Sequence, residues 1–191
     1  MRETNRKQII LRTATTLMTA AMMILIFFFS TEPADKSDKT SGQISRQVID
    51  VMYPDYPDMT GAEQKSLFDS VQHAVRKTAH FTEYTILGLL IRFCLQTWFG
   101  TRKWSLPGAW AAGTLYAGTD ELHQLLIDGR SGQWSDVILD SAGVLTGAAA
   151  ASLIIFAAVR RKRRKDSENR NGPRRRRKRS HDPRSDGVLY Q

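Results

Sequence analysis

Four long apolar stretches dominate the hydrophobic pattern, at about residues 9–29, 79–99, 106–127 and 136–159. A helix needs about 20 mostly apolar residues to cross a hydrocarbon core of roughly 30 Å. The first and fourth stretches are nearly free of charge, the second carries Arg92, and the third has a clean half followed by a charged half. The pattern predicts an all-α, polytopic membrane bundle of four transmembrane helices.

The first stretch also allows a second interpretation, because basic residues precede its apolar core as they do in a secretory signal peptide. No small-residue cleavage site of the A-x-A type follows, and the stretch has full spanning length. We therefore expect a retained membrane anchor at about residues 9–29, within an N-terminal segment of residues 1–43.

Residues 30–78, between the first two stretches, contain two weaker helical patterns. Their apolar positions are Ile44, Val48, Val51 and Met52 before the break at YPDYPD, and Leu67, Phe68, Val71 and Val75 after it. Thr60 and Glu63 form a candidate capping box at the start of the second pattern. We predict two short amphipathic helices on the outer membrane surface, the second leading into the 79–99 span. A disordered loop is the alternative.

Charge is concentrated at the C-terminus. The chain has a net charge of +9, yet residues 160–191 alone carry fourteen Lys and Arg against four Asp and Glu. A basic run directly after a spanning helix is typical of a cytoplasmic stop signal that attracts anionic lipids. No aromatic residue interleaves with this run, which argues against nucleic-acid binding. We predict a basic cytoplasmic tail, 160–191, that is disordered from Asp166 onward.

Basic residues near the ends of spans also predict the topology, since they are held on the cytoplasmic side. The basic flanks are Arg2, Arg6 and Lys7, then Arg102 and Lys103, then the run 160–165. Because successive spans cross the membrane in alternating directions, all three basic flanks lie on the cytoplasmic side. Residues 30–78 and the connection 127–135 then lie on the outer side. The prediction is a multi-pass plasma-membrane protein with cytoplasmic N- and C-termini.

Ionisable residues lie near the outer end of three predicted spans. At 1.5 Å rise per residue, Glu83 lies about 7 Å below the start of its span, Asp120 about 10 Å and Asp140 about 6 Å from the outer ends of theirs. The stripes at helical spacing are His80, Glu83, Tyr84 and Leu87; Asp120, His123 and Gln124; and Asp136, Asp140, Gly143 and Gly147. Lipid offers no partner to such stripes, so we expect them to face the bundle interior or a water-filled pocket.

Small residues continue the last of these stripes. Gly143, Gly147 and Ala151 follow one another at intervals of four residues. This small-xxx-small pattern lets another helix approach closely, so we expect a packing role for it.

The segments KTAHFTEY, DELHQ and DGRSGQWSDVILDSAG, with Gly147 after them, resemble the VanZ-like family of bacterial membrane proteins. The resemblance covers about residues 44–158, and the founding member of the family is linked to resistance to the glycopeptide teicoplanin. By position, it implies a polar site formed by Lys77, His80, Glu83, Tyr84, Asp120, Glu121, His123, Gln124, Arg130, Asp136 and Asp140. It also implies a bacterial plasma membrane, but no particular reaction.

Two interpretations of this site need no catalysis. A lattice of ion pairs and hydrogen bonds would hold three helices in register, although the acids outnumber the fixed cations Lys77 and Arg130. A binding protein would instead use Arg130, at the pocket mouth, to hold a carboxylate or phosphate of an envelope lipid or a cell-wall precursor. We favour binding, with membrane lipids and cell-wall precursors or glycopeptides as partners and an effect on glycopeptide susceptibility.

The alternative is a metal-dependent membrane hydrolase. His80, His123 and Glu121 are the candidate ligands of a divalent metal that would activate water against a lipid-linked phosphate or amide. No compact ligand motif such as H-x-x-x-H is present. We therefore expect no obligatory cofactor, leave the question of catalysis open, and make no prediction of oligomeric state.

Overall fold

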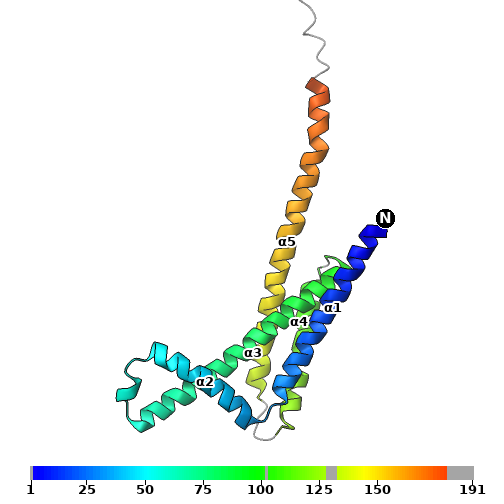
Figure 1. Ribbon diagram of the computed structural model, residues 1–191. Coiled ribbons are helices and arrows are strands. Elements are labelled where there is room, and N and C mark those ends of the chain that lie inside the picture. Colours follow the sequence, from blue (N-terminus) through cyan, green and yellow to red (C-terminus); the bar gives the residue numbers. More distant parts are fainter. Residues whose placement is uncertain (1, 102, 128–132, 180–191) are drawn as a thin grey trace, which may run out of the picture. The chain divides into compact units, whose positions relative to one another are not determined.

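The computed structural model describes residues 2–101, 103–127 and 133–179, and the regular secondary structure of this part of the chain is helical (Figure 1). The helices are α1 (Arg2–Ser30), α2 (Ala34–Met52), α3 (Gly61–Phe99), α4 (Ser105–Gln124) and α5 (Trp134–Arg179), with a short 3-10 turn at Tyr56–Asp58. The all-α prediction is confirmed. Contacts divide the chain into two compact units that meet after Ser152, within α5.

Among the described residues, two helices have the length and composition of a membrane span, and they lie at Asn5–Ser30 in α1 and Trp134–Asn169 in α5. Apolar side chains on α1 such as Leu17 and Phe28 are exposed, at 63% and 64%, as lipid-facing residues would be. The other two predicted spans lie within α3 and α4, whose composition is more polar. Composition therefore supports two of the four predicted spans.

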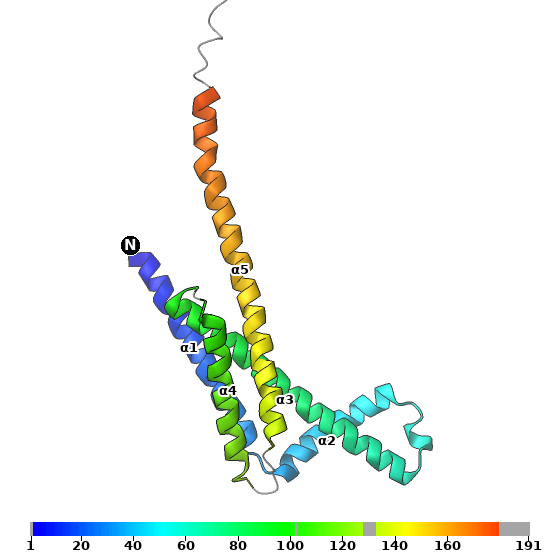
Figure 2. The same cartoon turned by 180° about the vertical axis from the view of Figure 1, so that it is seen from behind.

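Within the first unit, the long helices alternate in direction (Figures 1 and 2). Near the start of α1, the Arg12 Nε donates to the carbonyl of Thr97, near the end of α3, at 3.0 Å. Tyr116 of α4 donates to the carbonyl of Met23 in α1 at 2.6 Å. The first part of α5 runs back along α4, because Trp110 donates to the Ser141 hydroxyl at 2.9 Å while the end of α4 contacts the start of α5.

Helix α5 crosses α3 at very close range. A Cβ atom added at Gly147 would overlap the carbonyl of Thr85, and one added at Gly143 would lie 2.7 Å from a carbonyl oxygen of α3. From the other side, Gly88 of α3 faces the backbone of Val144. The close approach predicted at Gly143 and Gly147 is confirmed. Gly88 is the matching residue on α3, and the sequence pattern did not indicate it.

Helix α2 and the first half of α3 form a hairpin that extends away from α1 and α4 (Figures 1 and 2). The Glu63 N–H donates to the Thr60 hydroxyl at 3.4 Å, and the Thr60 N–H donates to the Glu63 carboxylate at 2.9 Å. The predicted capping box is thus confirmed. Helix α3 then continues without a break to Phe99, so the predicted second amphipathic helix and second span are one helix.

The two faces of α2 differ in side-chain size. Its face against α3 contains Ser41, Ser45 and Ile49, which are only 7%, 0% and 1% exposed. The predicted apolar positions Val51 and Met52 remain 80% and 67% exposed. The small hydroxyl residues bring the two helices together, and the larger apolar residues form a free face such as a membrane-surface helix presents.

The expectation of a disordered tail from Asp166 is wrong as far as Arg179, where α5 ends. Arg and Lys are good helix formers, so a basic run extends a helix readily. The Arg164 Nε also donates to the Glu168 carboxylate one turn later, at 3.0 Å. Residues 180–191 lie outside the described residues.

Candidate functional site

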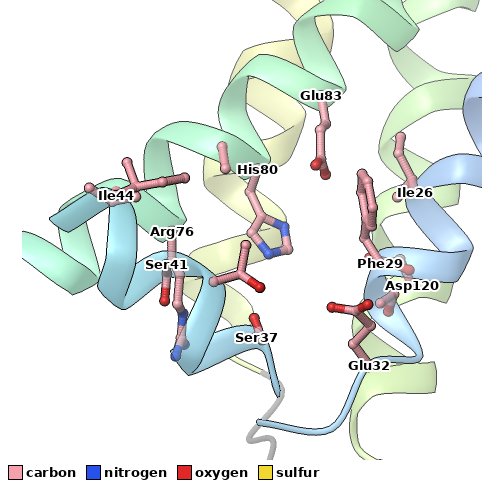
Figure 3. Close-up of a pocket in the computed structure, with 14 residues that line it drawn as sticks. Ile26, Phe29, Glu32, Ser37, Ser41, Ile44, Arg76, His80, Glu83 and Asp120 are labelled. Atoms are coloured by element: carbon pink, nitrogen blue, oxygen red, sulfur yellow. The ribbon is translucent and has the colours of Figure 1, made fainter. Parts of the chain in front are cut away.

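A cavity of about 330 Å³ lies where α1 ends, α2 begins, and α3 and α4 pass close by (Figure 3). Its lining residues are Ile26, Phe29 and Ser30 of α1, Glu32 after it, Ser37, Thr40, Ser41 and Ile44 of α2, Val75, Arg76, Ala79, His80 and Glu83 of α3, and Asp120 of α4. The volume is within the range of small-molecule pockets, roughly 300–1,000 Å³. The cavity is therefore large enough for a ligand group.

Three residues of the predicted site line this cavity: His80, Glu83 and Asp120. In Figure 3, the side chains of His80 and Glu83 extend from α3 toward a space that Phe29 and Asp120 border on the other side. His80 and Glu83 are neighbours on α3 because they are three residues apart. Two residues of the α3 stripe and one residue of the α4 stripe thus border the same space.

Asp120 lies deepest among these groups, with 4% of its surface exposed. The Gln124 side-chain amide, one turn later on α4, donates to its Oδ2 at 3.2 Å. Among the described residues, no group forms a hydrogen bond with the buried Oδ1 atom. The fully buried Tyr84 interacts electrostatically with Asp120 and with Asp140. Asp120 is thus a buried carboxylate at the wall of the cavity, in contact with Gln124 and Tyr84.

A second layer of acids lies behind the cavity, around Asp140 of α5. This residue is fully buried, and its Oδ2 lies 3.9 Å from the His80 Nδ1. The carboxylates that interact with it electrostatically are, in decreasing order, Glu121, Asp120, Asp136 and Glu83. Several carboxylates buried together are costly unless protons or cations neutralise them. The arrangement therefore favours positive charge at this end of the helices.

Other predicted site residues connect helices. Lys77 of α3 pairs with Asp136 of α5 at 3.3 Å, and both side chains are about one-third exposed, at 35% and 27%. Glu121 of α4 accepts a hydrogen bond from the backbone N–H of Gln133 at 3.0 Å, directly before α5. Such contacts are of the kind that a lattice of ion pairs and hydrogen bonds between the helices would contain. They are present beside the cavity.

His123 is oriented toward α1. Its ring stacks on Phe27 with a centroid distance of 4.8 Å and an interplanar angle of 26°. The residue is not among those that line the cavity. Across residues 2–101, 103–127 and 133–179, no group of three or more His, Cys, Asp or Glu side chains is arranged to hold a metal ion. The candidate ligands His80, His123 and Glu121 therefore form no such group. Arg130, the predicted anion-binding residue, lies outside the described residues.

Several lining residues were missed by the sequence analysis. They are the hydroxyl residues Ser37, Thr40 and Ser41 and the charged residues Glu32 and Arg76. A polar stripe is formed by Ser37, Ser41 and Ser45, which follow one another at intervals of one helical turn. This stripe resembles those on the predicted spans, but it lies in the segment between the first two spans, where no site residue was predicted. For Glu32, in the connection between two helices, no periodic signal exists.

Comparison with known proteins gives a family match. A family model described as VanZ/LLP1 matches residues 15–156, which include all the residues that line the cavity. No curated protein and no solved structure matches the chain.

Proposed function

The chain belongs to the VanZ/LLP1 family, and from this premise we propose that it is a multi-pass protein of a bacterial plasma membrane that binds an envelope lipid or cell-wall component in its cavity. Its membrane location is supported by the family and by the two span-like helices α1 and α5. Through this binding, the protein alters susceptibility to glycopeptide antibiotics of the teicoplanin type.

The proposed topology has four spans, formed by α1, α3, α4 and the first part of α5, with both termini in the cytoplasm. Alternating helix direction supports it, and the 20 residues of α4 extend for about 30 Å. At the end opposite the cavity, the cation of Arg12 lies 5.2 Å from the centre of the Trp98 ring, and that of Lys103 lies 5.4 Å from Trp104. Trp and basic residues together are typical of a cytoplasmic membrane interface. The cavity would then open to the outside.

The observation that carries the binding proposal is the mixed lining of the cavity. Ile26, Phe29 and Ile44 border the same space as His80 and Asp120 (Figure 3). A lattice built only for stability would fill such a space with packed side chains. An open cavity lined by both apolar and polar side chains suits a molecule with a polar head and a hydrocarbon portion, as envelope lipids have.

A protein that holds such a molecule at the outer leaflet would act where glycopeptides meet the cell surface. Its own groups would orient the ligand, with Asp120 and Glu83 accepting hydrogen bonds and Phe29 contacting the apolar part. No step of this role requires a bond to be broken. The metal-dependent hydrolase remains the alternative, although the described residues provide no ligand group for the metal.

Teicoplanin susceptibility of a glycopeptide-sensitive host tests this function. We expect the wild-type protein to raise the minimal inhibitory concentration above that of the empty vector. His80→Ala should abolish the increase with normal amounts in the membrane, because His80 lines the cavity. His73→Ala, two turns earlier on the same helix and exposed, is the matched control and should behave as wild type. A wild-type protein that leaves susceptibility unchanged would refute the proposal.

A further inference from the structure

Arg92 is a buried cation in the second half of α3, with only 3% of its surface exposed. It lies two helical turns before the end of α3 at Phe99, a distance of about 10 Å along the helix axis. In the proposed four-span topology, this depth is within the cytoplasmic leaflet, at the end of the helices opposite the cavity. A charged residue within a membrane span is costly and usually marks a functional site.

The protein contacts of Arg92 are neutral. Its Nε donates to the Ser152 hydroxyl of α5 at 2.9 Å, and its Nη1 donates to the Gln96 side-chain oxygen at 3.4 Å. Within residues 2–101, 103–127 and 133–179, no acid pairs with Arg92. A buried charge is stabilised by a partner of opposite charge. Ser152 and Gln96 satisfy hydrogen-bond donors of the guanidinium, but they supply no counter-charge.

The guanidinium of Arg92 retains donors for a further partner. A guanidinium carries five N–H donors, and the contacts with Ser152 and Gln96 use one donor each on Nε and Nη1. In the described part of the chain, the enclosed polar atoms that lack a hydrogen bond include no atom of Arg92, so its Nη2 reaches the molecular surface. The planar fork of a guanidinium matches two oxygens of one oxyanion. Arg92 can therefore bind an oxyanion and keep both of its protein contacts.

The direction of the Arg92 side chain indicates where the oxyanion comes from. Long side chains on a helix usually lean toward its N-terminus, but Arg92 extends to Gln96, one turn toward the C-terminal end of α3. Trp98 and Phe99 at that end are 49% and 59% exposed, as aromatic residues at a membrane interface are. The guanidinium is therefore directed toward the phosphate layer of the cytoplasmic leaflet. Basic groups between spans on this side of a membrane bind lipid head groups.

We propose that Arg92 binds the phosphate group of an anionic phospholipid of the cytoplasmic leaflet, while Ser152 and Gln96 hold its guanidinium in place. Arg92 is not among the residues that line the cavity, so this is a second site that goes beyond the proposed function. The phosphate of a phospholipid has two unesterified oxygens, which the guanidinium fork can contact together. Phosphatidylglycerol in the bilayer and free phosphate in the cytoplasm share this chemistry.

Thermal unfolding of the purified full-length protein in detergent separates these sources. Dioctanoylphosphatidylglycerol should raise the melting temperature, because a ligand that binds only the folded state stabilises it. Dioctanoylglycerol has the same chains without the phosphate, and inorganic phosphate has no chains, so both should change the melting temperature little. Stabilisation by inorganic phosphate that equals that of the lipid and is lost in Arg92→Gln would support a phosphate site but make free phosphate its ligand. Equal stabilisation by dioctanoylglycerol and dioctanoylphosphatidylglycerol would overturn the inference.

Variants of basic residues test whether the lipid binds at Arg92. Arg92→Gln removes the charge and the fork, so the affinity for dioctanoylphosphatidylglycerol should fall about tenfold, equivalent to about 1.4 kcal/mol. Arg92→Lys keeps the charge without the fork and should have an intermediate affinity. Arg46→Gln is the matched control, because it removes the same charge from an exposed position on α2, and it should bind the lipid as the wild type does. Wild-type affinity in Arg92→Gln would contradict the proposal.

Salt distinguishes a site at Arg92 from the exposed basic run 160–165, which also attracts anionic lipids. At about 1 M salt the Debye length is about 3 Å, so attraction to exposed charges is screened, whereas a buried pair is screened much less. The stabilisation by dioctanoylphosphatidylglycerol should therefore persist in the wild-type protein at this salt concentration. Its complete loss would show that the lipid is held by exposed charges and not by Arg92. This comparison uses only the wild-type protein, so it decides even where a variant folds poorly.

Discussion

The Glu121 carboxylate at the end of α4 accepts a hydrogen bond from the backbone N–H of Gln133, at 3.0 Å, immediately before α5 begins. The contact spans the connection between the two helices and places a negative charge at a helix N-terminus, where the helix dipole favours it. Glu121, which the sequence presented as a ligand residue, therefore has an identified structural contact.

Replacement of Glu121 should consequently reduce stability. A hydrogen bond to a charged group contributes about 1.5–3 kcal/mol, so Glu121→Ala should lower the melting temperature in detergent clearly. Glu121→Gln keeps an acceptor oxygen and should lower it less. Amide hydrogen exchange at the start of α5 should accelerate in both variants. Unchanged exchange at the start of α5 would show that the contact between Glu121 and Gln133 does not stabilise this end of the helix.

The close crossing of α3 and α5 should make glycine substitutions strongly dependent on position. Gly147→Ala places a methyl group against the Thr85 carbonyl, and overpacking of this kind costs about 1–3 kcal/mol. Gly118→Ala is the matched control on α4, where an added Cβ meets nothing within 4 Å. Alanine favours a helix over glycine by about 1 kcal/mol, so the control should be neutral or slightly more stable. Equal melting temperatures for the two variants would contradict the close crossing.

The start of α3 should depend on pH. Hydrogen bonds from the Thr60 side chain and backbone hold the pKa of Glu63 below its ordinary value of 4.5. A lowered folded-state pKa gives stability that is present above the ordinary value and is lost as the pH falls through the lower one. The protection factors of the amides in the first turn of α3, which correct for the intrinsic pH dependence of exchange, should therefore fall as the pH drops below 4.5, and Thr60→Val should weaken this dependence. Because Glu63 is fully exposed, the effect should stay local. Protection factors that are independent of pH would remove the assignment.

The four-span topology predicts opposite labelling of two positions in intact cells. In a Cys94→Ser background, Gly61→Cys in the α2–α3 hairpin should react with an impermeant thiol reagent, because an added side chain there meets nothing within 4 Å. Ser167→Cys, beyond the basic run of α5, should react only after the cells are opened. Labelling of the second position alone would place the cavity on the cytoplasmic side.

Local features of this protein follow from sequence because their determinants are three or four residues apart. The Thr60–Glu63 capping box and the glycine row on α5 are of this kind, and the convergence of His80 and Asp120 required only the polar stripes and the alternation of spans. The part of the cavity formed by α2 did not follow in this way. It depends on α2 folding back onto α3, where Gln72 donates to the Ser41 hydroxyl at 3.1 Å.

His123 shows the same limit within a predicted stripe. Its spacing from Asp120 places it near the polar face of α4, but the helix turns it toward Phe27 of α1. The contact between α1 and α4 joins residues far apart in the chain, so no periodicity in the sequence indicates it. The prediction of disorder in the tail failed for another reason. A low apolar content indicates that a segment forms no hydrophobic core, but it does not prevent Arg and Lys from forming a helix.

The central claim is that the cavity at the end of the helices is a working ligand site. Ala79→Trp places a bulky ring on the cavity wall, whereas Ala74→Trp places the same ring on an exposed part of α3 that does not line the cavity. The decisive measurement is the teicoplanin minimal inhibitory concentration of the two variants at matched amounts of membrane protein. We predict loss of tolerance in Ala79→Trp and wild-type tolerance in Ala74→Trp. Wild-type tolerance in both would contradict the claim.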